Sequence, residues 1–301
     1  MTFTRKTALL SAALGTAGLA ASAQAGIIRH DVPLADYQAF AATLPSIGFL
    51  PLPSGGCTGV LIADTWVLTA GHCVTIDGRF SVAEFDGVAY DIAEVFTHPD
   101  WLADEDYGAG RDLALLRLEN PVAGVTPSPL YTGTANALLG QTASTAGYGL
   151  VRDGFGANVG APNVGDSKTG GQNVIDALGS SVFSSVTDDI LLIDMDNPTD
   201  PAASVLGSAV PLPLEINPAG GDSGSPLLVD VGGILHVAGI ASFAPDLTGP
   251  SDGNQAFRYG GGGAYGFVGS PENLAFINTT IPEPASLSLL AIAGLAVRRR
   301  R

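Results

Sequence analysis

Short runs of apolar residues, separated by turns rich in glycine and proline, cover most of the chain. The apolar runs at 57–62 and 66–70 flank a turn at Ala63-Asp64 and predict a buried hairpin. Residues 113–118 are nearly all apolar, as in a strand that is buried on both faces. With 40 glycines and 20 prolines among 301 residues, this pattern indicates an all-β protein rather than a helical one.

The remaining segments of the first half are more polar. Residues 80–97 alternate loosely between apolar and polar, so we expect an exposed strand pair at 88–96, followed by an acidic loop at 100–110. A linker between prolines at 121–129 then separates two halves, which we place at about 26–125 and 126–280.

The second half repeats the pattern of short strands. Residues 150–180 contain many glycine, asparagine and aspartate residues and few large apolar ones, which predicts a glycine-rich surface loop or insertion. Ser270 and Pro271 are typical of a helix cap and a first helical position, so a short helix is predicted to end near Asn278. The predicted strands of this half cover 142–149, 190–193, 226–229, 235–242 and 265–268.

Both ends of the chain have the composition of targeting signals. Residues 1–25 combine a basic start, a short apolar run and a small-residue cleavage site at Ala23-Gln24-Ala25, which predicts a secretory signal peptide rather than a membrane anchor. Residues 281–301 join Ile281-Pro282-Glu283-Pro284 to another short apolar run and four terminal arginines. An apolar run followed by basic residues is a stop-transfer pattern with its positive end inside.

This C-terminal arrangement resembles the PEP-CTERM sorting tail of Gram-negative bacteria. The resemblance implies a transient membrane tether, cleavage by an exosortase-like transpeptidase, and release to the surface or the surrounding matrix. A plain tail anchor is the alternative. Together with a signal peptide removed by signal peptidase, the tail predicts a secreted or cell-surface protein of a Gram-negative bacterium.

Acidic residues far outnumber basic ones. The formal charge is −16, from 13 Lys and Arg residues against 29 Asp and Glu residues. The two ends hold six of the basic residues and one of the acidic residues, so residues 26–281 carry −21. This charge argues against a nucleic-acid partner, because phosphate binding needs a basic face. The acidity itself favours solubility outside the cell.

Three short motifs supply a nucleophile, a base and a carboxylate. His72 follows a predicted strand, Asp112 precedes another, and Ser223 lies in the glycine-rich turn at 220–226. A serine hydroxyl becomes an effective nucleophile when an imidazole takes its proton, and a buried carboxylate fixes the tautomer of that imidazole. Taken alone, each motif could also have a purely structural role. Together they predict a hydrolytic site.

The joint pattern resembles the chymotrypsin-like (trypsin-like) serine endopeptidases, whose motifs occur in the same chain order. The resemblance spans roughly residues 27–279. It rests on Thr69-Ala70-Gly71-His72-Cys73, with one substitution at Gly71, on Asp112-Leu113-Ala114-Leu115-Leu116, on Gly221-Asp222-Ser223-Gly224-Ser225-Pro226, and on later strand signatures at 146–149, 239–243 and 264–268.

The resemblance implies a fold and a set of roles. The fold would be two six-stranded antiparallel β-barrels and a short C-terminal helix, with His72 and Asp112 from the first barrel and Ser223 from the second. The amides of Gly221 and Ser223 would form the oxyanion hole. The only two cysteines, Cys57 and Cys73, match the disulfide beside the histidine, a bridge worth roughly 3 kcal/mol in the chain-entropy model.

Departures from the family pattern concern the substrate. By resemblance, Asn217 forms the base of the primary specificity pocket, and Ser242, Phe243 and Ala244 form one of its walls. Asn217 is neutral and Ala244 replaces a glycine, so the sequence favours a small or medium uncharged side chain over lysine or arginine.

Most of the other polar residues are interpreted as structural. In this family Asp222 commonly pairs with a new N-terminal ammonium, and Gly26-Ile27-Ile28 would supply it after signal removal or trimming by one residue. His98 and His236 are interpreted as structural, and His30 has no assigned role. No cofactor or metal is predicted, since the acidic residues at 100–106 are interpreted as a solvated loop rather than a calcium site.

The sequence therefore predicts a secreted serine endopeptidase that cleaves proteins or peptides through an acyl-enzyme. Two alternatives stay open: a catalytically weak or inactive surface-binding module on the same fold, and an esterase that uses the same triad. Because all three essential positions are filled, the sequence favours an enzyme.

Overall fold

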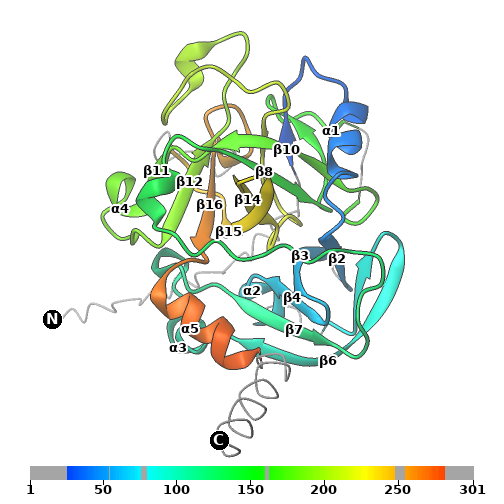
Figure 1. Cartoon of the computed structure of the whole chain (residues 1–301). Coiled ribbons are helices and arrows are strands. Elements are labelled where there is room, and N and C mark those ends of the chain that lie inside the picture. The colour runs from blue at the N-terminus through cyan, green and yellow to red at the C-terminus, as the bar shows by residue number, and fades with distance from the viewer. Residues whose placement is uncertain (1–25, 54, 76–79, 160–162, 248–254, 282–301) are drawn as a thin grey trace, which may run out of the picture.

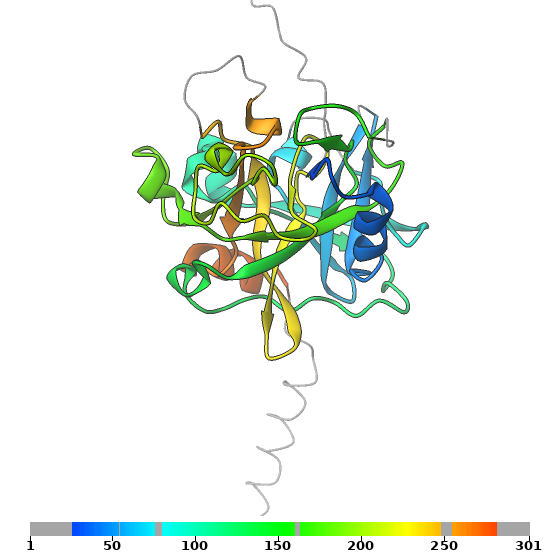
Figure 2. The same ribbon diagram turned by 90° about the horizontal axis from the view of Figure 1, so that it is seen from above.

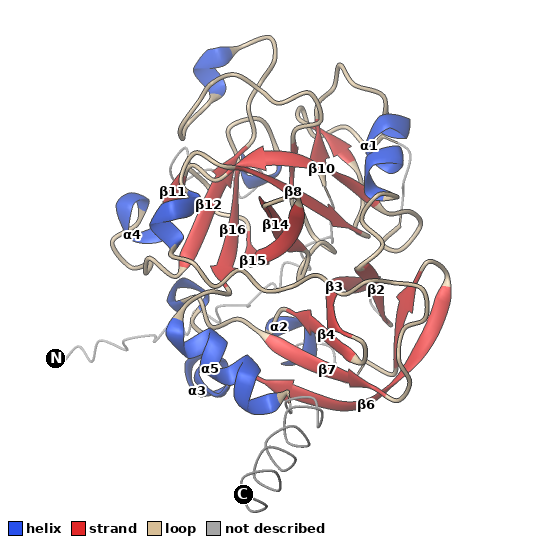
Figure 3. Cartoon of the chain, viewed as in Figure 1, coloured by secondary structure: helices blue, strands red, loops and turns tan. Residues whose placement is uncertain are grey.

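The computed structural model describes residues 26–53, 55–75, 80–159, 163–247 and 255–281. Figure 1 shows two bodies of strands stacked on one another, with helices at their edges. Strands dominate both bodies, as the colouring of Figure 3 makes plain. The predicted signal peptide and almost all of the predicted sorting tail lie outside the described residues. Within the described ranges, no helix is both long and apolar enough to cross a membrane.

The lower body is a closed barrel of six strands from the first half of the chain. Neighbouring strands are antiparallel, and the predicted hairpin at 57–70 is present as β3 and β4. The expected strand pair at 88–96 is instead one long strand, β6, which joins β5 to β7. Around the barrel the order is β2 (Ile47–Leu52), β3 (Gly55–Ala63), β4 (Trp66–Thr69), β7 (Ala114–Leu118), β6 (Val88–Thr97) and β5 (Val82–Phe85).

The upper body is a curled antiparallel sheet of seven strands rather than the expected six-stranded barrel. Its central hairpin, β14 and β15, turns at Gly232-Gly233 as predicted. The all-β class with two sheets is thus confirmed, and the strand count of the second sheet is corrected. The order is β10 (Thr169–Val174), β8 (Thr142–Gly147), β14 (Pro226–Val231), β15 (Ile234–Phe243), β16 (Gly262–Phe267), β12 (Ile190–Asp194) and β11 (Ala177–Leu178).

Strand β10 lies inside the segment that was predicted to be a glycine-rich surface loop. It pairs with β8 over six residues and is mostly buried. Its two glycines are needed for close packing: a Cβ on Gly171 would lie 2.1 Å from the Leu214 carbonyl oxygen, and one on Gly170 would lie 2.7 Å from the Ala146 Cβ. The loop prediction failed here because small residues in a strand leave no apolar pattern to detect.

The N-terminal segment packs on the second sheet although it precedes the first barrel in the chain. Strand β1 (Ile27–Ile28) pairs with β13 (Ile216–Asn217) and with β9 (Arg152–Asp153). Helix α1 (Leu34–Ala41) packs against β10 and β8 and is seen beside that sheet in Figure 2. The start of the described chain is therefore held close to the turn that carries Ser223.

The C-terminal helix α5 (Pro271–Thr280) returns to the first barrel. Ser270 caps it by accepting a hydrogen bond from the Asn273 amide, as the sequence predicted. Ile277 is buried in the core of the first barrel, where its burial contributes roughly 1.5–3 kcal/mol. That core also contains Leu228 and Ile240 of the second sheet, so one apolar cluster connects both bodies.

Short helices complete the fold. The expected acidic loop at 100–110 is corrected, because it contains helix α3 (Pro99–Asp104) and the 3₁₀ turn η1 (Tyr107–Ala109). The other short helices are α2 (His72–Thr75), α4 (Gly179–Val182), η2 (Ala135–Leu138), η3 (Pro201–Ala203) and η4 (Gln255–Phe257).

Candidate active site

His72 begins helix α2, directly after strand β4 and the turn Ala70-Gly71. Its ring Nδ1 lies 2.7 Å from Asp112 Oδ2, and its backbone amide donates to Asp112 Oδ1, also at 2.7 Å. Asp112 is fully buried. Because the carboxylate can only accept from the ring, Nδ1 carries the proton and Nε2 is left with a lone pair.

Asp112 accepts a third hydrogen bond, from the hydroxyl of Ser242 on β15 at 2.6 Å. A buried carboxylate needs such partners, since its desolvation is otherwise costly. The Gly71 substitution in the histidine motif has a local reason: a Cβ there would lie 2.7 Å from Cδ1 of Trp101 and 3.1 Å from Asp112 Oδ1. The aspartate is thus fixed from both sheets, and the chain beside it is close-packed.

Ser223 lies in the turn between β13 and β14. Two neighbouring glycines have positive φ, Gly221 at 94° and Gly224 at 83°. A Cβ on Gly224 would lie 2.2 Å from the carbonyl oxygen of Thr58 and from the hydroxyl of Thr69. The serine turn is therefore pressed against the first barrel, which only glycine permits at this position.

Backbone contacts bring the three residues to one junction. The Thr58 amide donates to the Ser223 carbonyl at 2.8 Å, and Thr58 follows Cys57 in the chain. Cys57 forms the predicted disulfide with Cys73, which is the next residue after His72 and whose Cα lies 6.3 Å away from that of Cys57. On the other side, the Gly224 amide donates to the Ala241 carbonyl, one residue before Ser242.

The two amides predicted to form an oxyanion hole lie in this turn. The Gly221 carbonyl accepts from the Thr58 hydroxyl at 3.3 Å, which holds the peptide between Gly221 and Asp222. The amides of Asp222, Gly224 and Ser225 all donate to backbone carbonyls. Those of Gly221 and Ser223 donate to no protein group within the described part of the chain.

Asp222 points away from this junction, into the second half. It is buried and accepts hydrogen bonds from the amides of Ala219 and Gly149, each at 3.2 Å, and from the amide of Gly26. Burial raises the pKa of Asp222 to about 6, and the three amide donors oppose that rise. The structure thus places Gly26 beside the carboxylate for which the sequence proposed it as a partner.

Comparisons with known proteins agree with this arrangement. The Trypsin family profile matches residues 37–164. Chymotrypsin-like elastase family member 1 of Canis lupus familiaris is 28% identical over 233 residues, 67% of this chain and 78% of that protein.

The chain is therefore similar to the trypsin-like serine proteases.

Shorter matches and a solved structure extend the comparison. Vitamin K-dependent protein C of Rattus norvegicus is 35% identical over 109 residues, 33% of this chain and 23% of that protein. Trypsin V-A of the same species is 30% identical over 111 residues, 33% of this chain and 42% of that protein. The structure of neuropsin, a serine protease expressed in the limbic system of mouse brain, superposes with a TM-score of 0.57 at 19% identity. It covers 85% of this chain and 99% of its own, and it shows the shared fold.

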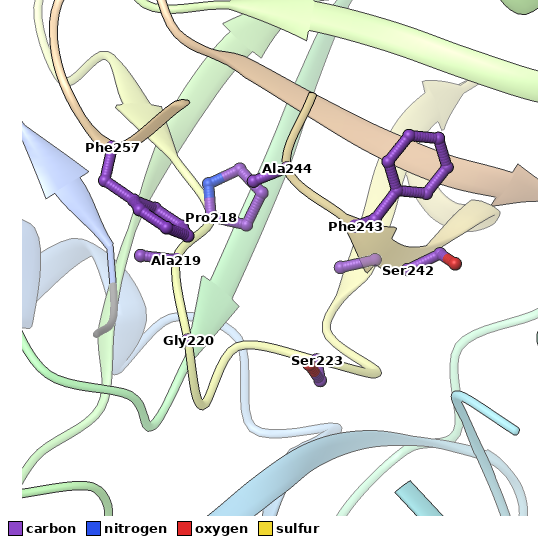
Figure 4. A pocket seen from close by; sticks show the side chains of 9 residues that line it. Pro218, Ala219, Gly220, Ser223, Ser242, Phe243, Ala244 and Phe257 are labelled. Atoms are coloured by element: carbon purple, nitrogen blue, oxygen red, sulfur yellow. The ribbon is translucent and has the colours of Figure 1, made fainter. Parts of the chain in front are cut away.

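A cavity of about 180 Å³ opens beside Ser223. Ser242, Phe243 and Ala244, which the sequence proposed as a pocket wall, are among the residues that line it. Asn217 does not line it: it is fully buried, and its side-chain amide donates to the Gly261 carbonyl at 3.0 Å. Among the described residues, the lining consists of Pro218, Ala219, Gly220, Ser223, Ala241, Ser242, Phe243, Ala244 and Phe257, most of which Figure 4 labels.

Two contributors to this candidate site could not be found from the sequence. The hydrogen bond from Ser242 to Asp112 joins residues 130 positions apart, and no local motif signals it. Phe257 lies in a segment of polar and glycine residues without periodicity, so nothing marked it as a lining residue. Both act through contacts that only the folded chain creates.

The remaining histidines lie outside the junction. His98 is buried and caps α3 by accepting from the Asp100 amide, and burial lowers the pKa of its ring. His236 contacts the Ile234 carbonyl on an exposed strand end. His30 Nδ1 lies 2.6 Å from the hydroxyl of Tyr259. Within the described ranges, no group of three or more His, Cys, Asp or Glu side chains is arranged to hold a metal ion.

Proposed function

We propose that this chain is a serine endopeptidase that hydrolyses peptide bonds in proteins or peptides. The observation that carries the proposal is the junction where the His72–Asp112 pair meets the turn of Ser223. Similarity to the trypsin-like serine proteases supports a serine-type peptidase, and the geometry is consistent with a role for each residue.

In this mechanism Ser223 Oγ attacks the carbonyl carbon of the scissile bond while His72 Nε2 takes the hydroxyl proton. Asp112 holds the ring and stabilises the imidazolium that forms. His72 then gives the proton to the leaving amine, and the C–N bond breaks to leave an acyl group on Ser223. A water molecule, deprotonated by His72, releases the acyl group and restores the serine.

The amides of Gly221 and Ser223 would stabilise the oxyanion of each tetrahedral intermediate. One donor of this kind is worth about 3–4 kcal/mol of transition-state stabilisation. Two observations support this role: neither amide donates to a protein group within the described residues, and Gly221 has a positive φ.

The proposal includes an N-terminus at Gly26. In the full chain an uncharged amide of Gly26 meets the buried carboxylate of Asp222. Cleavage after Ala25 would replace that amide with an ammonium group, which pairs with a buried carboxylate far better. Signal removal alone would then complete the site, with no separate activation step.

Export and sorting belong to the proposal as well. They rest on the composition of residues 1–25 and of the C-terminal tail from residue 281. The proposed partners are signal peptidase, an exosortase-like transpeptidase and a transient membrane tether. The proposed location is outside the cell or on the surface of a Gram-negative bacterium.

Labelling with a fluorophosphonate probe tests the proposed function. Protein that begins at Gly26 should be labelled, Ser223→Ala should not, and the exposed-serine control Ser81→Ala should be labelled like wild type. Labelled protein should also cleave a denatured protein substrate. No Ser223-dependent label would contradict the enzyme, and label without peptide cleavage would favour the esterase.

A further inference from the structure

The cavity beside Ser223 lies between two chain segments. Residues 218–220 form one side and residues 242–244 the other, with Ser223 at one end and Phe257 at the other (Figure 4). A peptide bond at Ser223 would therefore place the side chain on its acyl side, the P1 side chain, between these segments.

Nine residues of the described part of the chain line the cavity, and none of them is charged. Two of these lining residues, Ser223 and Ser242, carry a hydroxyl. The hydroxyl of Ser242 already donates to Asp112. A lysine, arginine or acidic side chain would therefore lose its hydration here without gaining a partner, which is costly.

The size of the cavity sets a second limit. A closed apolar cavity of roughly 150 Å³ holds one benzene molecule. At about 180 Å³, this cavity has room for a side chain of leucine, methionine or phenylalanine size. Ala241 and Ala244 keep it open to that width, whereas longer side chains at these positions would fill it.

Phe257 closes the far end and is held by apolar contacts. It packs against a buried cluster that contains Ile27 of β1 together with Met195, Ala219 and Tyr259. Phe257 therefore packs on this cluster and also lines the cavity. A rigid aromatic wall of this kind favours apolar and aromatic side chains.

Resting on the proposed peptidase function, we propose that this cavity selects apolar P1 side chains of leucine to phenylalanine size and that Phe257 is a specificity-determining residue. The proposal differs from the expectation based on Asn217 and Ala244, which favoured small or medium uncharged side chains and assigned no role to Phe257.

The test compares peptides that differ only at P1. Active sites are first counted with a fluorophosphonate, which needs no P1 side chain. The value of kcat/KM for leucine, methionine and phenylalanine peptides should exceed that for arginine, lysine and aspartate peptides by about 100-fold. Labelled enzyme that prefers a charged or glycine P1 residue overturns this inference alone. Enzyme without label overturns the proposed function, and the inference with it.

Variants of Phe257 isolate its role. Phe257→Ala should lower kcat/KM for the phenylalanine peptide by about tenfold, mainly through KM, and should leave fluorophosphonate labelling intact. Phe257→Leu, which keeps an apolar wall, should retain most of the activity. Phe155→Ala is the matched control, since Phe155 contacts Tyr259 from an exposed position outside the cavity. Equal P1 profiles for Phe257→Ala and Phe155→Ala would contradict the assignment.

Discussion

At the scale of single residues, Asp112 connects the two sheets. It accepts from the amide and ring of His72, which the first barrel positions, and from Ser242 of the second sheet. A buried carboxylate needs such hydrogen-bond partners. The Ser242 hydroxyl therefore helps to hold Asp112 in place, which makes Ser242 a positioning residue.

Removing the Ser242 hydroxyl tests this role. Ser242→Ala should lower kcat by about tenfold, which corresponds to about 1.4 kcal/mol of activation free energy. Because Ser242 also lines the cavity, the loss must be measured with several P1 peptides. A positioning role predicts the same factor for all of them, whereas a change confined to certain side chains would show that only the cavity wall was altered.

At the scale of elements, strand β1 links the start of the chain to the turn that carries Ser223. Its pairing with β13 places Gly26 at Asp222, the residue before Ser223, and Ile27 belongs to the buried cluster against which Phe257 packs. One short strand thus supports both the serine turn and the far end of the cavity. We expect activity to depend on how the chain begins.

An N-terminal extension tests that dependence. Two proteins that differ only by two alanines before Gly26 should differ in kcat/KM by at least about tenfold, with the extended protein less active. The reason is that a peptide amide replaces the ammonium beside the buried Asp222 carboxylate. Equal turnover of the two proteins, with equal fluorophosphonate labelling, would show that the ammonium pair is not required.

The loop at 195–215 is held by carboxylates. Asp194 accepts from the amides of Val205 and Leu206, and Glu215 accepts from those of Asp196 and Leu212. Asp194, Asp196 and Glu215 are all buried. This arrangement joins the loop to β12 and β13, which lead to the catalytic turn.

At the scale of the whole molecule, carboxyl groups with raised pKa values make the stability depend on pH. Burial raises the pKa of Glu215 to about 8, that of Asp176 to about 7 and that of Asp196 to about 6. In an unfolded chain such groups titrate near pH 4. The folded state therefore holds more protons between about pH 4 and pH 8, so the free energy of unfolding falls as the pH rises through this window.

Chemical denaturation of the Ser223→Ala protein, which should not digest itself, measures this pH dependence of the free energy of unfolding. The free energy of unfolding should be at least about 1 kcal/mol higher at pH 5 than at pH 8. Glu215→Gln should reduce the difference, and the exposed control Glu119→Gln should not. A free energy that rises between pH 5 and pH 8 would contradict the assignment.

Much of the fold and of the site could be predicted from the sequence. The all-β class, the capped C-terminal helix and the Cys57–Cys73 disulfide are confirmed, because each depends on local pattern, cap chemistry or motif spacing. The catalytic roles of His72, Asp112 and Ser223 stay predictions that the geometry supports.

The features that could not be predicted from the sequence depend on contacts between distant segments. Strand β10 was not predicted because close packing requires its glycines, and glycines leave no apolar periodicity in the sequence. Asn217 was expected in the cavity and lies outside its lining, since its side chain is bonded to Gly261 instead. Phe257 enters the cavity from a segment with no pattern of its own.

The central claim is that Ser223 forms an acyl-enzyme with help from His72 and Asp112. The most direct measurement is mass spectrometry of the mature protein after acid quenching during turnover of a peptide ester with a P1 phenylalanine. The account predicts an acyl adduct that maps to Ser223, is absent from Ser223→Ala and accumulates far more slowly in His72→Ala. An adduct on another residue, or one that persists in Ser223→Ala, would contradict it.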